Sequence, residues 1–207
     1  MIKINKKLPY CFIIWGYSDS GKDTVFKLLE KHIPDLQNIK WVAPAKRMLE
    51  EWLQIPVGSL DDKDFRKNTK VRNTVTEELE SRTYDDLIVD SFHAWEYLTP
   101  GGWLTVGHVV DQLITNYISS GSEFDIAFTD TRKPIELEAI KTKLAAHYNL
   151  VFINVVGRGE QKSSDKFLTI EDFMFIDNMY WILNTSDVTL DELESKVKRI
   201  LSNLNKE

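Results

Sequence analysis

Gly16-Tyr-Ser-Asp-Ser-Gly-Lys-Asp-Thr24 follows the apolar run Tyr10–Trp15 and precedes a segment with helical spacing that begins at Val25. The stretch matches the pattern G-x-x-x-x-G-K, which surrounds phosphate when a strand precedes it and a helix follows. Because Gly16 and Gly21 lack a Cβ atom, the backbone between them can adopt positive φ angles and turn its N–H groups inward. The sequence therefore predicts a phosphate-binding loop at the end of a buried strand.

The side chains of this loop add charge and hydroxyl groups to the predicted site. The helix that starts near Lys22 directs its free N–H groups at the anion, and the Lys22 ammonium can bridge the β- and γ-phosphates of a nucleotide. Asp23 stands where the pattern has Ser or Thr, and Thr24 supplies a hydroxyl one residue later. The alternative is a surface turn with a stray lysine. The predicted nucleotide-binding residues are Gly16, Ser18, Ser20, Gly21, Lys22, Asp23 and Thr24.

The composition is that of an ordinary globular protein, with 207 residues, 43% hydrophobic and 28% charged, and we expect one domain over residues 1–207. The net charge of -6 gives no general attraction for nucleic acid or an anionic membrane, so we expect neither as a partner. Cys11 lies in an apolar run and is expected to be buried and inert. The apolar run near the N-terminus is too short for a signal peptide, and no run has membrane-spanning length, which favours a cytoplasmic location.

Short apolar runs alternate along the chain with segments of helical spacing, which is typical of an α/β fold with a mostly parallel central sheet. Thr189 and Glu192 form a capping box before the last helix, and Pro134 suits the first turn of another helix. The expected strands are Tyr10–Trp15, Ile39–Ala43, Phe124–Phe128, Leu150–Val156 and Tyr180–Leu183.

Three further segments accompany the loop: Ala43-Pro-Ala-Lys-Arg-Met-Leu49, Phe128-Thr-Asp-Thr-Arg-Lys-Pro-Ile-Glu-Leu-Glu-Ala-Ile140 and Tyr180-Trp-Ile-Leu-Asn184. With G-x-x-x-x-G-K-D-T, they resemble in order the sequence blocks of phage-type deoxynucleoside monophosphate kinases, within the P-loop nucleoside monophosphate kinase group. The resemblance implies a three-layer P-loop fold, with an acceptor-binding helical insertion at 45–121 and a short lid at 157–172. It also implies transfer of the γ-phosphoryl group of ATP to a (deoxy)nucleoside monophosphate with Mg²⁺, in the host cytoplasm if the origin is a phage.

Charged residues follow two of the predicted strands, at the edge where open parallel sheets bind their ligands. By the resemblance, Asp130 organises magnesium, with Asp23 as a second metal candidate, while Arg132 and Arg158 complete the cationic surround of Lys22. The four together are the predicted catalytic residues. From the residues alone, an Asp-x-Arg after a strand is more often a local turn and ion pair, and Arg158 fits an exposed glycine turn equally well.

The acceptor phosphate requires at least one cation, and the predicted acceptor-binding residues are Lys46, Arg47, Arg72 and His108. Where the family has an arginine in its central helix, this chain has Leu104-Thr-Val-Gly-His108, so His108 is a hypothetical replacement. The alternative for Arg72 is an exposed, solvated charge.

Two other functions stay open from the sequence. One is a different P-loop small-molecule kinase, such as one acting on a coenzyme precursor, and the other is a nucleotide-binding regulatory module without catalysis. We expect small-molecule nucleotides as the ligands, and a homodimer is left open.

Overall fold

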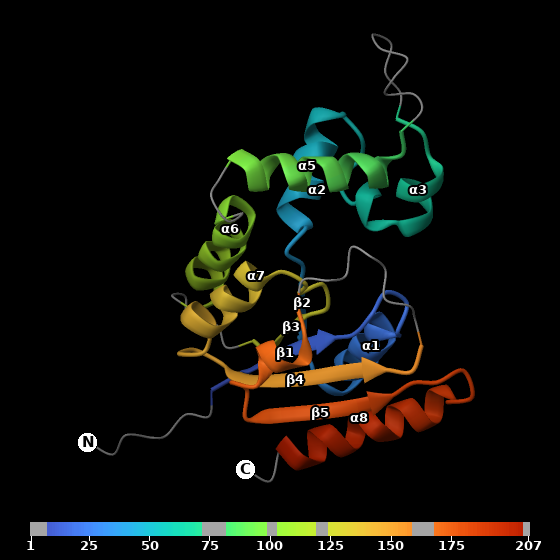
Figure 1. Ribbon diagram of the computed structural model, residues 1–207, viewed down its shortest axis with the longest axis vertical. Helices are drawn as coiled ribbons and strands as arrows, with labels where there is room; N and C mark the ends of the chain where they lie inside the picture. The colour runs from blue at the N-terminus through green and yellow to red at the C-terminus, as the bar shows by residue number, and fades with distance from the viewer. Residues whose placement is uncertain (1–7, 72–81, 99–102, 119–123, 159–167, 205–207) are drawn as a thin grey trace. The chain divides into compact units, whose positions relative to one another are not determined.

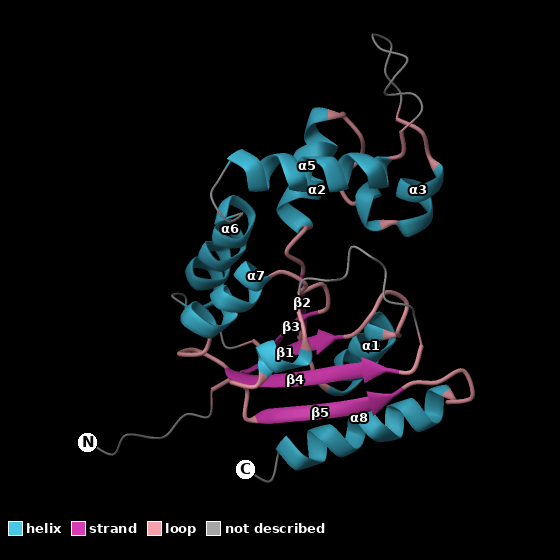
Figure 2. Ribbon diagram, viewed as in Figure 1, coloured by secondary structure: helices cyan, strands magenta, loops and turns pink. Residues whose placement is uncertain are grey.

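The computed structural model describes residues 8–71, 82–98, 103–118, 124–158 and 168–204 (Figure 1). A five-stranded sheet has the order β2-β3-β1-β4-β5, and every pair of neighbouring strands is parallel. The predicted parallel α/β fold is thus confirmed, with the loop-bearing strand in the centre. Figure 2 shows the arrows of β4 and β5 running side by side in one direction. The strands are β1 (Tyr10–Trp15), β2 (Gln37–Ile39), β3 (Ile126–Phe128), β4 (Asn149–Val156) and β5 (Asn178–Leu183).

One predicted strand was placed wrongly. We expected a strand at Ile39–Ala43, but β2 ends at Ile39 and Ala43 begins helix α2 (Ala43–Trp52). The apolar residues of this stretch lead into the helix instead of forming a strand. Pro44 fits the first turn of α2, because the N–H groups there have no partner within the helix. Lys40 consequently follows a strand instead of lying inside one.

The helices alternate with the strands of the sheet. The capping box before the last helix is confirmed, since the Thr189 N–H donates to Glu192 Oε2 at 2.9 Å and the Glu192 N–H donates to Thr189 Oγ1 at 3.3 Å. Pro134 begins a helix as predicted. The remaining elements are α1 (Lys22–His32), η1 (Ser59–Asp61), α3 (Lys63–Asn68), α5 (Tyr84–Leu98), α6 (Trp103–Leu113), η3 (Ile114–Ile118), α7 (Pro134–Ala139), η4 (Ile140–Leu144), η5 (Ile170–Phe173) and α8 (Leu190–Leu204).

Helices α1 and α8 pack on one face of the sheet and contact one another (Figure 1). Alternate residues of β1 and β4, including Phe12 and Ile153, point into this core, where Val197 of α8 is fully buried. On the opposite face, Phe173 of η5 stacks on Phe152 with ring centroids 4.3 Å apart. The sheet is therefore covered on both faces, as parallel sheets usually are.

Cys11 lies in the central strand and is buried, as predicted. Burial raises the pKa of its thiol well above the ordinary range, because the thiolate loses its hydration. A thiol that stays protonated is a poor nucleophile, so the expected inertness agrees with its surroundings.

The chain divides into two compact units, residues 1–40 with 112–207, and residues 41–111. The first contains the sheet. The second contains α2, α3 and α5 around a small apolar core that includes Leu49, Leu60 and Tyr84. It overlaps the segment 45–121, whose acceptor-binding role stays a prediction. Among the described residues, no helix combines the length and the apolar character needed to cross a membrane.

Candidate nucleotide-phosphate site

Segments that follow all five strands meet at one edge of the sheet, because the carboxyl ends of parallel strands lie together. The central position at this edge belongs to the glycine loop, and four other segments flank it in the order of the strands. The edge thus consists of Lys40 after β2, Asp130 after β3, Gly16–Gly21 after β1, Arg158 after β4 and Asn184 after β5.

The two glycines of the loop are required both by conformation and by space. Gly16 has φ 151° and Gly21 has φ 100°, angles that side chains disfavour. A Cβ atom on Gly16 would lie 2.4 Å from the Val155 carbonyl oxygen, and one on Gly21 would lie 2.3 Å from Asn184 Nδ2. The backbone is therefore held close to its neighbours, with α1 beginning directly after Gly21.

The Lys22 side chain folds back over the loop. Its ammonium donates hydrogen bonds to the carbonyl oxygens of Gly16 at 2.7 Å and Tyr17 at 2.6 Å. A positive charge thus lies directly above the turn that the sequence predicts to hold phosphate, next to the amino end of α1. The arrangement provides a cation and a helix N-terminus for one anion.

Asn184 braces the loop from the neighbouring segment after β5. Its buried side-chain amide donates to the Ser20 carbonyl oxygen at 2.8 Å. Ser20 is only 1% exposed, so its side chain lies under the loop and its hydroxyl does not face solvent. The sequence analysis listed Asn184 only as the last residue of the segment Tyr180–Asn184 and gave it no role. Its contact could not be foreseen, because it joins residues 164 positions apart.

Replacing Asn184 with alanine should destabilise the chain by about 1–3 kcal/mol, since the buried Ser20 carbonyl loses its donor. Urea unfolding measures this loss, and the matched control is Asn203→Ala on the exposed side of α8, which should stay within about 0.5 kcal/mol of wild type. Equal stability of the two variants would contradict the bracing role.

The segment after β3 is fixed by the buried carboxylate of Glu136. Its Oε2 accepts hydrogen bonds from the backbone N–H groups of Arg132 at 2.6 Å and Lys133 at 2.9 Å. Burial, together with the charge of Asp130, raises the pKa of Glu136 to about 7. Glu136 therefore shapes the turn that carries Asp130 and Arg132, while the Arg132 side chain is exposed.

This raised pKa predicts a pH-dependent stability. The pKa of Glu136 rises from 4.5 to about 7 on folding. The stabilisation of the folded state that this shift provides is therefore complete below pH 4.5 and is lost as the pH rises through 7. Glu136→Gln keeps a neutral acceptor for both N–H groups, and should be more stable than wild type by up to about 3 kcal/mol at pH 8, with most of this gain absent at pH 5. Urea unfolding in EDTA at both pH values checks this.

The exposed Glu138 in the same helix is the control, because Glu138→Gln should follow wild type at both pH values. A Glu136→Gln gain that is the same at pH 5 and pH 8 would exclude titration of Glu136 as its cause.

Arg158 lies at the predicted edge but is turned toward the segment after β5. Its Nε donates to the Thr185 carbonyl oxygen at 2.8 Å and its Nη2 donates to the Val188 carbonyl oxygen at 3.0 Å. The side chain would have to leave these carbonyls to reach a transferred phosphoryl group. Of the predicted lid at 157–172, residues 159–167 lie outside the described part of the chain.

Two of the predicted acceptor residues, Lys46 and Arg47, are engaged within residues 41–111. Lys46 Nζ lies 3.1 Å from Asp61 Oδ1, and Arg47 pairs with Asp61 and, at 2.6 Å, with the buried carboxylate of Glu50. Burial acts to raise the pKa of Glu50, but hydrogen bonds from the Leu60 N–H and Arg47 outweigh it and lower the pKa. Both cations thus stabilise the turn at Ser59–Asp61.

Of the other two predicted acceptor residues, only His108 lies in the described part of the chain. His108 is exposed on α6. Arg72 lies outside the described residues. Their acceptor roles stay predictions.

Lys40 is a residue of the edge that the sequence analysis missed. Its ammonium lies 3.5 Å from Asp23 Oδ1 and donates a hydrogen bond to Thr129 Oγ1. The predicted strand Ile39–Ala43 included Lys40, and a lysine inside a strand is not expected to contact the loop. A strand end at Ile39 would have placed it at the binding edge.

The oxygen atoms at this edge suit magnesium, which prefers hard oxygen ligands and keeps several waters. Thr24 is exposed in the first turn of α1, and Asp130 follows β3. Among the described residues, no group of three or more His, Cys, Asp or Glu side chains gathers to hold a metal. A magnesium ion would therefore depend on water and on phosphate oxygens, and Asp23 is already paired with Lys40.

The chain is similar to solved structures over nearly its whole length. A candidate kinase from Chloroflexus aurantiacus J-10-fl has 10% identity and a TM-score of 0.50, covering 95% of this chain and 98% of that one. Dephospho-CoA kinase from Campylobacter jejuni has 12% identity, coverages of 96% and 99% and a TM-score of 0.47. TT1252 from Thermus thermophilus has 17% identity, coverages of 96% and 99% and a TM-score of 0.46.

No protein-family model and no curated protein matches the chain. The likeness to the Chloroflexus structure supports the α/β fold with its central parallel sheet.

Proposed function

We propose that the chain is a P-loop kinase that transfers the γ-phosphoryl group of ATP to a (deoxy)nucleoside 5′-monophosphate. The observation that carries the proposal is the loop itself, in which the Lys22 ammonium lies over a turn built on two glycines with positive φ. This geometry suits the triphosphate of a nucleotide.

The roles follow from the charges at the edge. The backbone N–H groups between Gly16 and Thr24 would bind the donor phosphates, and Lys22 would exchange its carbonyl acceptors for phosphate oxygens and follow the migrating charge. Asp130, together with water, would hold Mg²⁺, which when bound would neutralise charge on the phosphate oxygens. Arg132, which is exposed at the same edge, would contact a phosphoryl group.

The nature of the acceptor rests on the resemblance of four sequence blocks to phage-type deoxynucleoside monophosphate kinases. Lys46 and Arg47 both form ion pairs that stabilise the turn at Ser59–Asp61. Since the predicted acceptor cations are engaged in these pairs, a second acceptor class is also considered. That second class is a small molecule such as a coenzyme precursor. Nucleotide binding without catalysis is the third alternative.

The test is ADP release from ATP and Mg²⁺ with each natural ribo- and deoxyribonucleoside monophosphate, and with dephospho-coenzyme A, as the acceptor. We expect at least one monophosphate to raise ADP release far above the rate without acceptor. Activity with the coenzyme precursor alone would move the assignment to the second class. ATP binding without ADP release for any acceptor would favour the regulatory module.

A further inference from the structure

The pair formed by Lys40 and Asp23 connects two segments of the sheet edge. Lys40 stands directly after β2, and Asp23 lies in the first turn of α1 beside Lys22. The ammonium lies 3.5 Å from Asp23 Oδ1, and Thr129, just past β3, accepts a further hydrogen bond from it. The Lys40 side chain is 30% exposed, against 83% for Asp23, so the more enclosed member of the pair is the cation.

Asp23 creates an electrostatic conflict at this position. A carboxylate in the first turn of a helix is favoured by the helix dipole, but the same N-terminus has to receive an anionic polyphosphate. Two negative charges a few ångströms apart near a protein surface repel one another enough to change an affinity on the order of tenfold. A cation held against Asp23 removes this repulsion.

We propose that Lys40 is a positioning residue that compensates the charge of Asp23, so that the loop can bind a polyphosphate without repulsion from that carboxylate. Thr129, which is 4% exposed, anchors the ammonium on the side of the sheet. The residue that breaks the phosphate-loop pattern is thereby paired with a lysine far away in sequence. The inference rests on the proposed function only in that the loop binds a polyphosphate.

The experiment is calorimetric titration with inorganic tripolyphosphate and, separately, with ATP. The variants are Lys40→Met, Lys40→Arg, Asp23→Asn and the double variant Lys40→Met with Asp23→Asn. The control is Lys143→Met, which removes the same charge from an exposed lysine of η4. η4 precedes the first residue of β4, so Lys143 lies near the end of the sheet opposite the glycine loop.

Lys40→Met should weaken the binding of both ligands about tenfold, and the loss should shrink at high salt, where exposed charges are screened. Lys40→Arg should restore binding to within about threefold of wild type, since it keeps the charge. The double variant should also return to within about threefold, because the carboxylate that needed compensation is gone. Lys143→Met should bind as wild type does.

Three results would overturn the inference: wild-type affinity in Lys40→Met, a double variant as weak as Lys40→Met, or a wild-type chain that binds neither ligand. The second would mean that Lys40 contacts phosphate directly. The third would also remove the proposed function, whereas phosphate binding without phosphotransfer would remove the function alone and leave the role of Lys40 standing.

Discussion

Lys22→Met should lower kcat/KM for phosphotransfer at least about a hundredfold, because one preorganised electrostatic group commonly contributes about 3 kcal/mol to transition-state stabilisation. Methionine keeps the length of the side chain without its charge, so the hydrogen bonds to the Gly16 and Tyr17 carbonyls and to phosphate are all lost. Steady-state assays of ADP release with the best acceptor measure the effect.

The matched control is Lys27→Met, an exposed lysine of the same helix, which should keep wild-type kinetics. Since an unfolded variant would also be inactive, thermal unfolding of each variant accompanies the assay. A folded Lys22→Met variant with more than half of the wild-type activity would remove Lys22 from the catalytic residues.

Gly16→Ala should weaken ATP binding by more than about tenfold and destabilise the chain by about 1–3 kcal/mol, the usual cost of a strained backbone conformation. The added Cβ would lie 2.4 Å from a backbone oxygen of β4 and 2.7 Å from Ser20 Oγ, so the loop has to move. Movement displaces the Gly16 carbonyl that holds the Lys22 ammonium. Calorimetry and urea unfolding report the two effects.

Gly107→Ala is the control for this change. Gly107 lies in α6, and a Cβ there would have no neighbour within 4 Å. The variant should bind ATP normally and gain up to about 1 kcal/mol of stability, since alanine is the better helix former. If Gly16→Ala instead bound ATP as tightly as Gly107→Ala does, the loop would not be the phosphate site.

The sequence was sufficient for the parallel sheet and the loop because both have local signatures. β1 lies at the predicted Tyr10–Trp15, and the capping box of Thr189 and Glu192 forms as expected, since each depends on residues a few positions apart. The order of the strands and the brace from Asn184 depend on contacts between distant residues, which no local pattern contains.

The predicted acceptor cations illustrate a second limit of sequence reasoning. A lysine or arginine in a motif can contact a ligand or pair with a neighbouring carboxylate. The sequence alone does not show which of the two it does. Lys46 and Arg47 are paired with Asp61 and Glu50, whereas Lys40, which no motif included, lies against the loop helix. Ion pairs between segments are therefore what the structure adds to the site.

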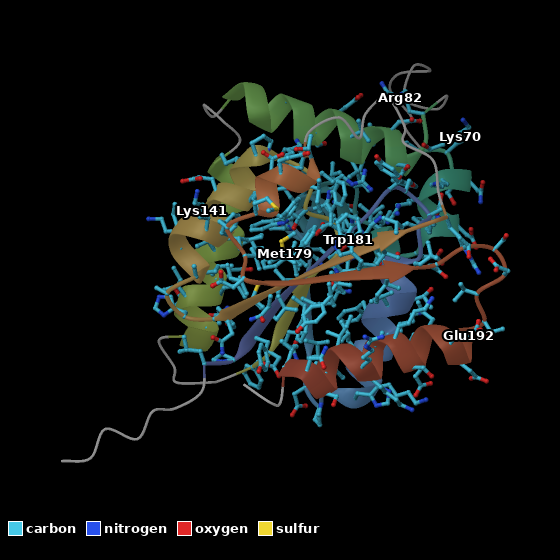
Figure 3. All side chains as sticks on the ribbon, turned by 60° about the horizontal axis from the view of Figure 1, so that its bottom comes forward. Lys70, Arg82, Lys141, Met179, Trp181 and Glu192 are labelled. Carbon is cyan, nitrogen blue, oxygen red and sulfur yellow. The ribbon has the colours of Figure 1, made fainter. Side chains whose placement is uncertain are left out.

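The edge strand β5 has a further feature that local patterns do not reveal. Met179 and Trp181 are labelled on this strand in Figure 3, and Trp181 is 60% exposed. Its apolar residues predicted a strand correctly, but they did not predict that β5 lies at the edge of the sheet with Trp181 exposed and Ile182 buried. An apolar run alone does not distinguish a central strand from an edge strand.

The most direct test of the central claim is a crystal structure of the chain with Mg²⁺ and a non-hydrolysable ATP analogue. We expect the β- and γ-phosphate oxygens to accept hydrogen bonds from the backbone N–H groups between Gly16 and Thr24. We also expect the Lys22 ammonium to leave the Gly16 and Tyr17 carbonyls for phosphate. An analogue bound elsewhere, with Lys22 still on those carbonyls, would contradict the account.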